Sequence, residues 1–245
     1  MTDSAPSPTR PDVSGGPGRV VAVVGASGVL GAQVARQLLE LGDHVVATAR
    51  DTERLAPLVD LAPDRCTTCR VDLRDPGAGD DLLEAVRRGP GRLDAVVLAA
   101  GVVAFGDLVD TPDDVIEELF VTNVVGPLWL LRRLVPELAE RRGVVVSISA
   151  VVAERPLPGM AAYSASKAAL SSADEALRRE LRRRGIRVVD ARPPHTETGL
   201  VHRALSGSPP TLPQGARPVD VARRIVDVLD DPDITALAAE DFDAT

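Results

Sequence analysis

The sequence predicts a single α/β domain in which a doubly wound parallel sheet lies between two layers of helices. Short runs rich in Val, Ala and Leu alternate with longer amphipathic segments along most of the chain, an alternation typical of right-handed strand–helix–strand units. Hydrophobic residues make up 44% of the chain but aromatic residues only 2%, so the core must be aliphatic. An aliphatic core suits a parallel sheet that is buried on both faces.

Six apolar runs are expected as buried strands, with a seventh, shorter strand near the C-terminus. The strands are expected over residues 19–24, 44–49, 69–73, 93–98, 143–149, 186–191 and 234–238, and the helices over residues 32–41, 80–88, 111–142, 160–184 and 218–229. The helix over 111–142 is expected to break before Thr122 and to bend near Pro127, because proline disrupts a continuing helix.

Two segments have neither helical nor strand periodicity. Residues 1–18 are rich in Pro, Ser, Gly and Thr, which predicts a disordered N-terminal tail before a domain over residues 19–245. A cloning remnant or a mis-called start would have the same composition. Residues 199–217 are expected to form a mobile flap over the functional site.

Composition and charge exclude several function classes. The net charge is −8, whereas a nucleic-acid partner requires a basic face. We find no apolar run long enough for a signal peptide or a membrane span, so we expect a cytoplasmic protein. Cys66 and Cys69 are the only cysteines. A redox pair or half of a metal site are the alternatives, but zinc requires more ligands, so we expect one semi-buried and one exposed thiol and no metal.

A glycine-rich turn joins the first strand to the first helix. Gly25, Gly28 and Gly31 follow the apolar run over residues 19–24 directly. Glycines let a phosphate approach the backbone, and the start of a helix offers free N–H groups and a positive dipole end. The turn therefore predicts a dinucleotide site, although a tight turn without a ligand has the same pattern.

The ends of the second and fourth strands refine this prediction. Arg50 directly follows the second strand, where an acidic residue would bind the ribose of NAD and a basic residue accommodates the phosphate of NADP. Arg50 favours NADP over NAD, although Asp51 comes next in the chain. The small residues Ala99, Ala100 and Gly101 close the fourth strand, and small residues at this position let a ligand lie close.

Tyr163 and Lys167 are the only tyrosine and the only lysine among 245 residues, and the other 27 basic residues are arginines. Residues four apart share one face of a helix, so the phenol and the ammonium are expected in one site. A nearby cation lowers the pKa of a phenol, and such a tyrosine serves as a general acid or base. An ordinary packed tyrosine and solvated lysine are the alternative.

This combination resembles the short-chain dehydrogenase/reductase family over roughly residues 19–232. The run from Tyr163 to Leu170 is close to the family signature, and Asn123, the only asparagine, lies forty residues before Tyr163 as the family's catalytic asparagine does. The resemblance implies a Rossmann fold and hydride transfer between NAD(P)(H) and a carbonyl or alcohol.

The resemblance also implies a role for each matching residue. Tyr163 would exchange the proton of the substrate oxygen, Lys167 would lower the tyrosine pKa and bind the nicotinamide ribose, and Asn123 would hold a water in the proton relay. The implied cofactor contacts are Gly25, Ser27, Val29, Leu30 and Gly31 at the phosphates, Asp72 and Leu73 at the adenine, Ala99, Ala100 and Gly101 at the adenosine ribose, and Pro193, Thr196 and Thr198 at the nicotinamide end.

The chain departs from the family pattern in four places. The family's carbonyl-polarising serine is Ala150 here, and Ser149 is its neighbour, which could replace it only if the strand end shifts. Losing that donor costs on the order of 3 kcal/mol in the transition state. Val29 stands where the family has its middle glycine. Residues 98–101, Leu-Ala-Ala-Gly, stand where the family has Asn-Asn-Ala-Gly. His195 follows two prolines and is a second candidate donor.

The expected function is an NADPH-preferring carbonyl reductase or alcohol dehydrogenase that acts on a small apolar or mixed molecule. The alternatives are a dinucleotide-binding sensor with impaired catalysis, or a non-redox epimerase or dehydratase on the same scaffold. The resemblance further implies a homodimer or homotetramer in which the helices of Trp129 and Tyr163 form the interface.

Overall fold

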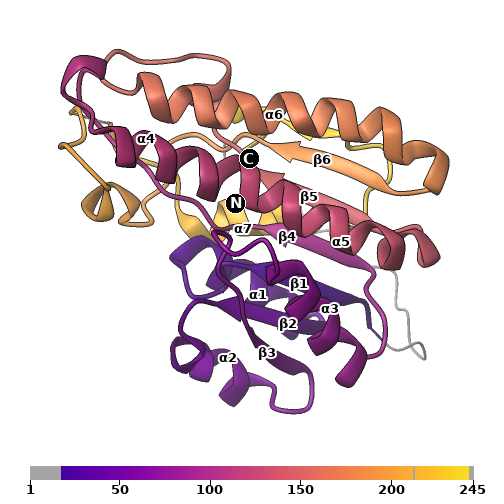
Figure 1. Cartoon of the computed structure of the whole chain (residues 1–245). Helices are drawn as coiled ribbons and strands as arrows, with labels where there is room; N and C mark the ends of the chain where they lie inside the picture. The colour runs from indigo at the N-terminus through magenta and orange to yellow at the C-terminus, as the bar shows by residue number, and fades with distance from the viewer. Residues whose placement is uncertain (1–17, 212, 243–245) are drawn as a thin grey trace, which may run out of the picture.

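Seven parallel strands form one sheet in the spatial order β3-β2-β1-β4-β5-β6-β7 (Figure 1). This arrangement comes from a computed structural model, which describes residues 18–211 and 213–242. The chain winds from β1 outward to β3, returns to β4 beside β1, and winds outward again to β7. The prediction of a doubly wound parallel sheet is confirmed, whereas the tail predicted over residues 1–18 lies, apart from Gly18, outside the described residues.

The elements are close to the predicted ones. The strands are β1 Val20–Val24, β2 His44–Ala49, β3 Cys66–Arg70, β4 Ala95–Leu98, β5 Val144–Ile148, β6 Arg187–Ala191 and β7 Ala236–Leu237. The helices are α1 Val29–Glu40, α2 Ala56–Leu61, α3 Ala78–Arg88, α4 Asp113–Phe120, α5 Gly126–Glu140, α6 Ala161–Leu181 and α7 Pro218–Asp227. The short helix α2 was not predicted from the sequence.

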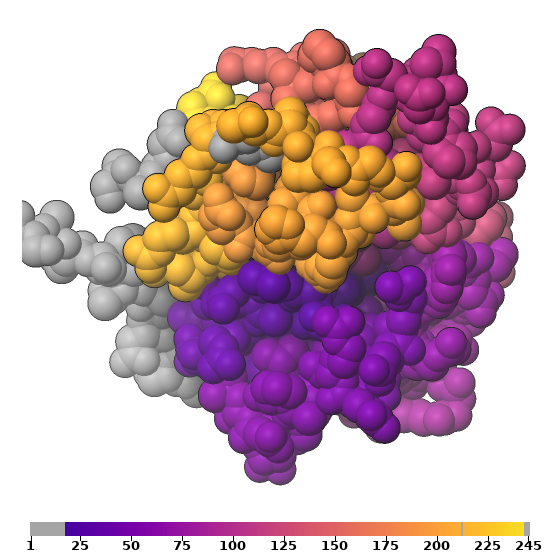
Figure 2. Space-filling view, turned by 90° about the vertical axis from the view of Figure 1, so that its left-hand side faces the viewer, coloured from indigo at the N-terminus to yellow at the C-terminus, as the bar shows by residue number. Residues whose placement is uncertain are grey.

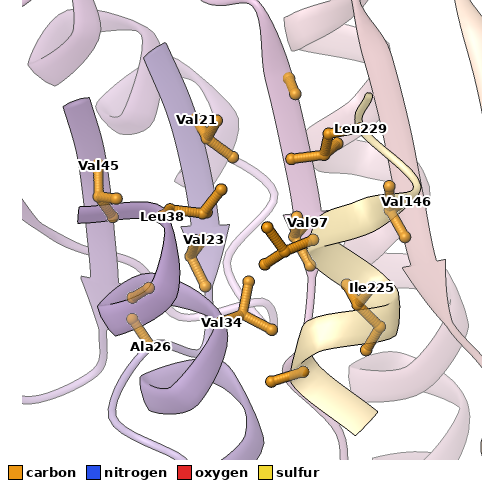
Figure 3. Close-up of a cluster of buried hydrophobic side chains, with 14 of the residues drawn as sticks. Val21, Val23, Ala26, Val34, Leu38, Val45, Val97, Val146, Ile225 and Leu229 are labelled. Carbon is orange, nitrogen blue, oxygen red and sulfur yellow. The ribbon is translucent and has the colours of Figure 1, made fainter. Parts of the chain in front are cut away.

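Two hydrophobic cores lie on the two faces of the sheet. Alternate side chains of a strand point to opposite faces, so Val21 and Val23 of β1 pack with α1 and α7, as Figure 3 shows. Val20 and Val24 of the same strand belong to the other core, under α3, α5 and α6. Figure 1 shows α4, α5 and α6 lying together across one face. Burial on both faces explains why the central strands are continuously apolar.

The edge strand β3 corrects two expectations. It was predicted over residues 69–73 but begins at Cys66 and ends at Arg70, because pairing with β2 extends it through the polar pair Thr67 and Thr68. Cys66 and Cys69 are both buried rather than one being exposed, and they belong to different cores. Three residues apart on a strand, the thiols face opposite sides of the sheet and remain free.

A π-helical turn, Val121–Val125, joins α4 to α5. The predicted break before Thr122 is therefore a local widening of a continuous helix, and Pro127 is the second residue of α5, directly after the widened turn. Single π turns inside α-helices occur frequently at functional sites. This turn carries Asn123, which is buried. Among the described residues, no helix combines the length and the apolarity needed to cross a membrane.

Candidate active site

A cavity of about 490 Å³ opens at the carboxyl ends of the strands. It is lined by the turn after β1, by the loops after β2, β4, β5 and β6, and by the first turns of α6. It lies where the chain changes direction between β1 and β4, the position at which sheets of this type bind ligands. In Figure 2 the orange surface of the chain around residue 200 lies directly above the indigo and purple surface of the N-terminal half.

The turn between β1 and α1 forms one end of the cavity. Gly25 has a φ of +87°, and a Cβ atom there would lie 2.7 Å from the backbone nitrogen of Ala100, so only glycine fits between the two loops. α1 begins after Gly28 without a side-chain cap and without an acidic residue in its first turn. Its first N–H groups are therefore available to an anion.

Asn123 and Lys167 meet beside Gly101. A Cβ atom on Gly101 would lie 3.2 Å from Asn123 Oδ1 and 3.4 Å from Lys167 Nζ. Asn123 holds the loop after β4 in both directions, because its Oδ1 accepts from the Val102 N–H (2.9 Å) and its Nδ2 donates to the Val102 carbonyl (3.0 Å). Lys167 Nζ donates to the carbonyl oxygen of Ile148 at the end of β5 (2.9 Å).

Ser166 connects the asparagine to the helix of the tyrosine. Its hydroxyl accepts from Asn123 Nδ2 (3.0 Å) and donates to the carbonyl of Tyr163 (2.7 Å). Ser166 is fully buried, so this bridge is shielded from solvent. The sequence drew no attention to Ser166, because a serine inside a helix has no distinguishing pattern.

Burial controls the protonation of Tyr163 and Lys167. It raises the pKa of Tyr163 to about 12 and lowers the pKa of Lys167 to about 8, against the opposing effect of Asp190 and then Asp174. The sequence suggested that Lys167 lowers the tyrosine pKa. In the structure the removal of the phenol from water dominates instead, and Tyr163 is a protonated phenol at neutral pH.

The hydroxyl of Ser149, next to Ala150, is hydrogen-bonded within the protein. It is buried, donates to the Asp190 carboxylate, and lies 3.4 Å from the carbonyl of Ala191. Ser149 and Ala150 both line the cavity, but the Ser149 hydroxyl donates to Asp190 and Ala150 has only a methyl group. His195 lines the cavity, with its Nε2 3.5 Å from a carboxylate oxygen of Glu197.

Two arginines line the cavity beyond the end of β2. Arg50 and Arg54 are both exposed and both lie in its wall, and Arg54 was not predicted because it lies on a short 3₁₀ helix, Thr52–Leu55, without a pattern of its own. Asp51 caps that helix by accepting from the Glu53 N–H (3.1 Å). Asp72 pairs with Arg74 at 2.6 Å, which holds the pKa of Asp72 down to about 2.

The predicted cofactor residues lie on this one cavity. Its walls include Gly25, Ser27, Val29, Leu30, Gly31, Arg50, Asp72, Leu73, Ala99, Ala100, Gly101, Tyr163, Lys167, Pro193, Thr196 and Thr198. Asn123 is buried behind Gly101 rather than in the wall. The structure therefore brings together residues that span most of the domain.

Part of the segment over residues 199–211 is hydrogen-bonded to the loop after β4. The Leu205 N–H donates to the carbonyl of Val103 (2.8 Å), and the Phe105 N–H donates to the carbonyl of Ser206 (2.9 Å). Apolar side chains surround the adjoining end of the cavity. This apolar lining comprises Val102, Val103, Phe105, Val151, Val152, Leu157, Met160, Leu200 and Val201.

Comparison with known proteins decides the family. A family model described as short chain dehydrogenase matches residues 19–208. This chain belongs to the short-chain dehydrogenase/reductase family. The structure of a short-chain dehydrogenase from Streptomyces avermitilis is 32% identical, with a TM-score of 0.82 over 92% of this chain and 91% of that one. Membership places the chain in a family of oxidoreductases.

Two curated relatives have the same level of identity. Dehydrogenase/reductase SDR family member 7B of Bos taurus is 33% identical over 227 residues, which cover 86% of this chain and 70% of the bovine protein. Glycine betaine reductase ATRR of Emericella nidulans is 33% identical over 230 residues, which cover 90% of this chain but only 18% of that protein. The match to the fungal enzyme therefore concerns one part of a much longer chain.

Proposed function

We propose that this short-chain dehydrogenase/reductase is an NADP(H)-dependent enzyme that reduces the carbonyl group of a small apolar or mixed molecule, or oxidises the corresponding alcohol. The observation that carries the proposal is the meeting of Asn123 and Lys167 at Gly101, in a cavity that also contains Tyr163 and the turn over residues 25–31. A dinucleotide that extends from that turn to Lys167 would place its phosphates at the turn and its nicotinamide ribose at Lys167.

The residues present fit a nicotinamide dinucleotide. The glycine cradle at Gly25 and the uncapped start of α1 would hold its phosphates. Ala99 and Ala100 have short side chains, so the adenosine ribose would lie close to the backbone there. Gly101 has no side chain that would obstruct the approach to Lys167 Nζ. When bound, the nicotinamide supplies or accepts the hydride.

Charge beyond β2 supports NADP over NAD. Arg50 and Arg54 bring two guanidinium groups to the cavity wall, and guanidinium binds phosphate oxygens well. The neighbouring carboxylates are occupied elsewhere, since Asp51 caps the 3₁₀ helix and Asp72 pairs with Arg74. The 2′-phosphate of NADP would therefore meet two guanidinium groups that form no hydrogen bond with these two acids.

Tyr163 is suited to act as a general acid. Because burial raises the pKa of the phenol to about 12, Tyr163 carries its proton at neutral pH and can donate it to a carbonyl oxygen. The ammonium of Lys167 would stabilise the phenolate that remains. Asn123, whose side chain fixes the loop after β4 at Val102, would hold a water in the proton relay. This arrangement favours the reduction direction.

The substrate end of the cavity predicts a slow reaction on an apolar molecule. Met160, Val152 and Phe105 contribute apolar surface there, while Ala150 lacks the hydroxyl that would polarise the carbonyl. Ser149 is bound to Asp190. Restoring a donor in Ala150→Ser is expected to raise turnover, on the order of 10-fold or more by analogy with oxyanion donors.

The test is oxidation of NADPH by the purified protein across a panel of aliphatic and aromatic aldehydes and ketones. Tyr163→Phe keeps the ring and is expected to lower turnover at least about 100-fold, with NADPH affinity unchanged. Tight NADPH binding without turnover in both wild type and Ala150→Ser would overturn the redox proposal and favour a sensor or a non-redox enzyme.

We also propose that the protein is a homodimer or homotetramer, through the face formed by α5 and α6. Trp129 is only half-buried on α5, as expected of an aromatic residue that packs against another copy. Light scattering of the wild type and of Trp129→Arg tests this: the wild type is expected as an oligomer and the variant as a smaller species. A monomeric wild type would contradict the proposal.

A further inference from the structure

A layer of polar side chains is buried between α6 and the strands β5 and β6, behind the proposed active site. From α6 come Lys167, Ser171 and Asp174, which share one helix face at spacings of four and three. From the sheet come Ser147, Ser149 and Asp190. All are buried except the half-buried Ser171. An α/β core of this kind normally has apolar side chains there, so the layer calls for a physical explanation.

Both carboxylate oxygens of Asp190 accept hydrogen bonds within the layer. One of its carboxylate oxygens accepts from the hydroxyl of Ser149, and the other accepts from the hydroxyl of Ser171 at 2.5 Å. Arg192 Nε lies 3.7 Å from the second oxygen. Hydrogen bonds donated to both oxygens stabilise a buried carboxylate.

Asp174 is arranged to remain neutral. Its Oδ1 accepts from the hydroxyl of Ser147 (2.9 Å), but its buried Oδ2 has no hydrogen-bond partner in the protein. A buried charge without partners is strongly unfavourable, and burial raises the pKa of Asp174 to about 8. At neutral pH Asp174 therefore keeps its proton.

Ser171, one turn along α6 from Lys167, and Ser149, which directly follows Ile148, both donate to the Asp190 carboxylate, so Asp190 lies near Lys167. The Lys167 ammonium donates to the Ile148 carbonyl, which is neutral, and burial lowers its pKa to about 8, so it is close to losing its proton at physiological pH. Asp190 has the larger opposing effect and Asp174 the smaller. Of the other groups on these elements, Tyr163 and Asn123 are uncharged, and Arg192 is paired with Glu154 and Asp190.

We infer that Asp190 is the buried counter-ion that keeps Lys167 an ammonium, and that Asp174 stays protonated beside it so that the layer supplies one negative charge rather than two. Asp190 acts on the reaction only through Lys167 and is a positioning residue. This inference rests on the proposed role of Lys167. It also explains why Ser149 is unavailable to the substrate: its hydroxyl stabilises the counter-ion.

The single lysine of the chain makes the inference directly measurable. Protein labelled with [ε-¹³C]lysine has one labelled side chain, and its chemical shift against pH gives the Lys167 titration without any assignment. The wild type is expected to be an ammonium at pH 7. Asp190→Asn is expected to lower the pH midpoint of the Lys167 titration by on the order of one pH unit. Below pH 8, Asp174→Asn replaces one neutral group by another, so this variant is expected to change the midpoint by no more than a few tenths of a pH unit.

Glu175→Gln on the exposed side of α6 is the matched control and is expected to have no effect. An unchanged midpoint in Asp190→Asn, or a neutral Lys167 at pH 7 in the wild type, would overturn the inference. If circular dichroism shows that Asp190→Asn is unfolded, Ser171→Ala removes one donor to Asp190 and is expected to lower the midpoint by a smaller amount; no shift there would also overturn it.

The titration is independent of turnover, so it separates this inference from the proposed function. If no carbonyl is reduced but the midpoint shifts as expected, the counter-ion is present and the redox proposal is wrong. If the enzyme turns over, Asp190→Asn is expected to shift the alkaline limb of the pH–rate profile to lower pH, which a purely structural defect would not do.

Discussion

A Cβ atom on Gly31 would lie 2.3 Å from the carbonyl oxygen of Gly25. The first turn of α1 therefore packs directly on the backbone that leaves β1, with no space for even a methyl group. The same carbonyl lies 3.4 Å from the corresponding point on Gly28, an ordinary van der Waals distance. Two glycines of one turn thus differ in what the structure requires of them, which the spacing in the sequence does not reveal.

Gly31→Ala is expected to damage the turn, and Gly28→Ala is expected to be tolerated. The clash with Gly25 forces the backbone apart, which costs about 1–3 kcal/mol of unfolding free energy and weakens NADPH binding at least about 10-fold. Gly28→Ala introduces no contact closer than 3.4 Å. Urea unfolding and fluorescence titration with NADPH measure both effects in Gly31→Ala, and an equal loss of unfolding free energy in Gly28→Ala would contradict the geometry.

Arg50→Ala and Arg54→Ala are each expected to reduce the preference for NADPH. Each removes a charged hydrogen-bond donor that would face the 2′-phosphate, worth about 1.5–3 kcal/mol, so kcat/KM falls on the order of 10-fold or more with NADPH and little with NADH. Arg36→Ala, on the exposed side of α1, is the control. A parallel fall with both cofactors would argue against a role at the phosphate.

Gly207→Ala is expected to release the segment that covers the substrate end of the cavity. A Cβ atom there would lie 2.0 Å from the Phe105 carbonyl oxygen, and its φ is +70°. Gly199 also has a positive φ, +65°, but has free space around it. Gly199→Ala and Gly207→Ala therefore both carry the cost of an alanine in the left-handed conformation, about 1–2 kcal/mol, and only Gly207→Ala also has the clash. We expect KM for the carbonyl substrate to rise several-fold in Gly207→Ala alone, with NADPH affinity unchanged; similar KM values would show that docking is unimportant.

Asp174→Asn is expected to remove a pH dependence of stability. Burial raises the pKa of Asp174 from 3.8 to about 8, so between these values the folded state keeps a proton that the unfolded state has released. Wild-type stability therefore falls as pH rises through this window, by up to about 1.4 kcal/mol per pH unit. Urea unfolding at several pH values should show this slope in the wild type and in Glu175→Gln but not in Asp174→Asn; a persisting slope would contradict a neutral buried Asp174.

The central strands and the glycine turn could be predicted because their signals are local. β1 and β2 are continuous apolar runs, since both faces of the sheet are covered. β3 was misplaced because it is an edge strand that includes Thr67 and Thr68, whose strand state comes from pairing with β2. Likewise α2 has only six residues, too few for helical periodicity to show.

By itself the sequence determined the fold class, the turn at Gly25 and the pairing of Tyr163 with Lys167, because each depends on residues close together in the chain. Only the tertiary structure decided that Asn123 meets Lys167 at Gly101, that Ser149 turns toward Asp190, and that Arg54 joins Arg50 at the cavity. The physical reason is that parallel strands bring their carboxyl ends to one edge, where packing between distant segments sets the direction and the charge of each side chain.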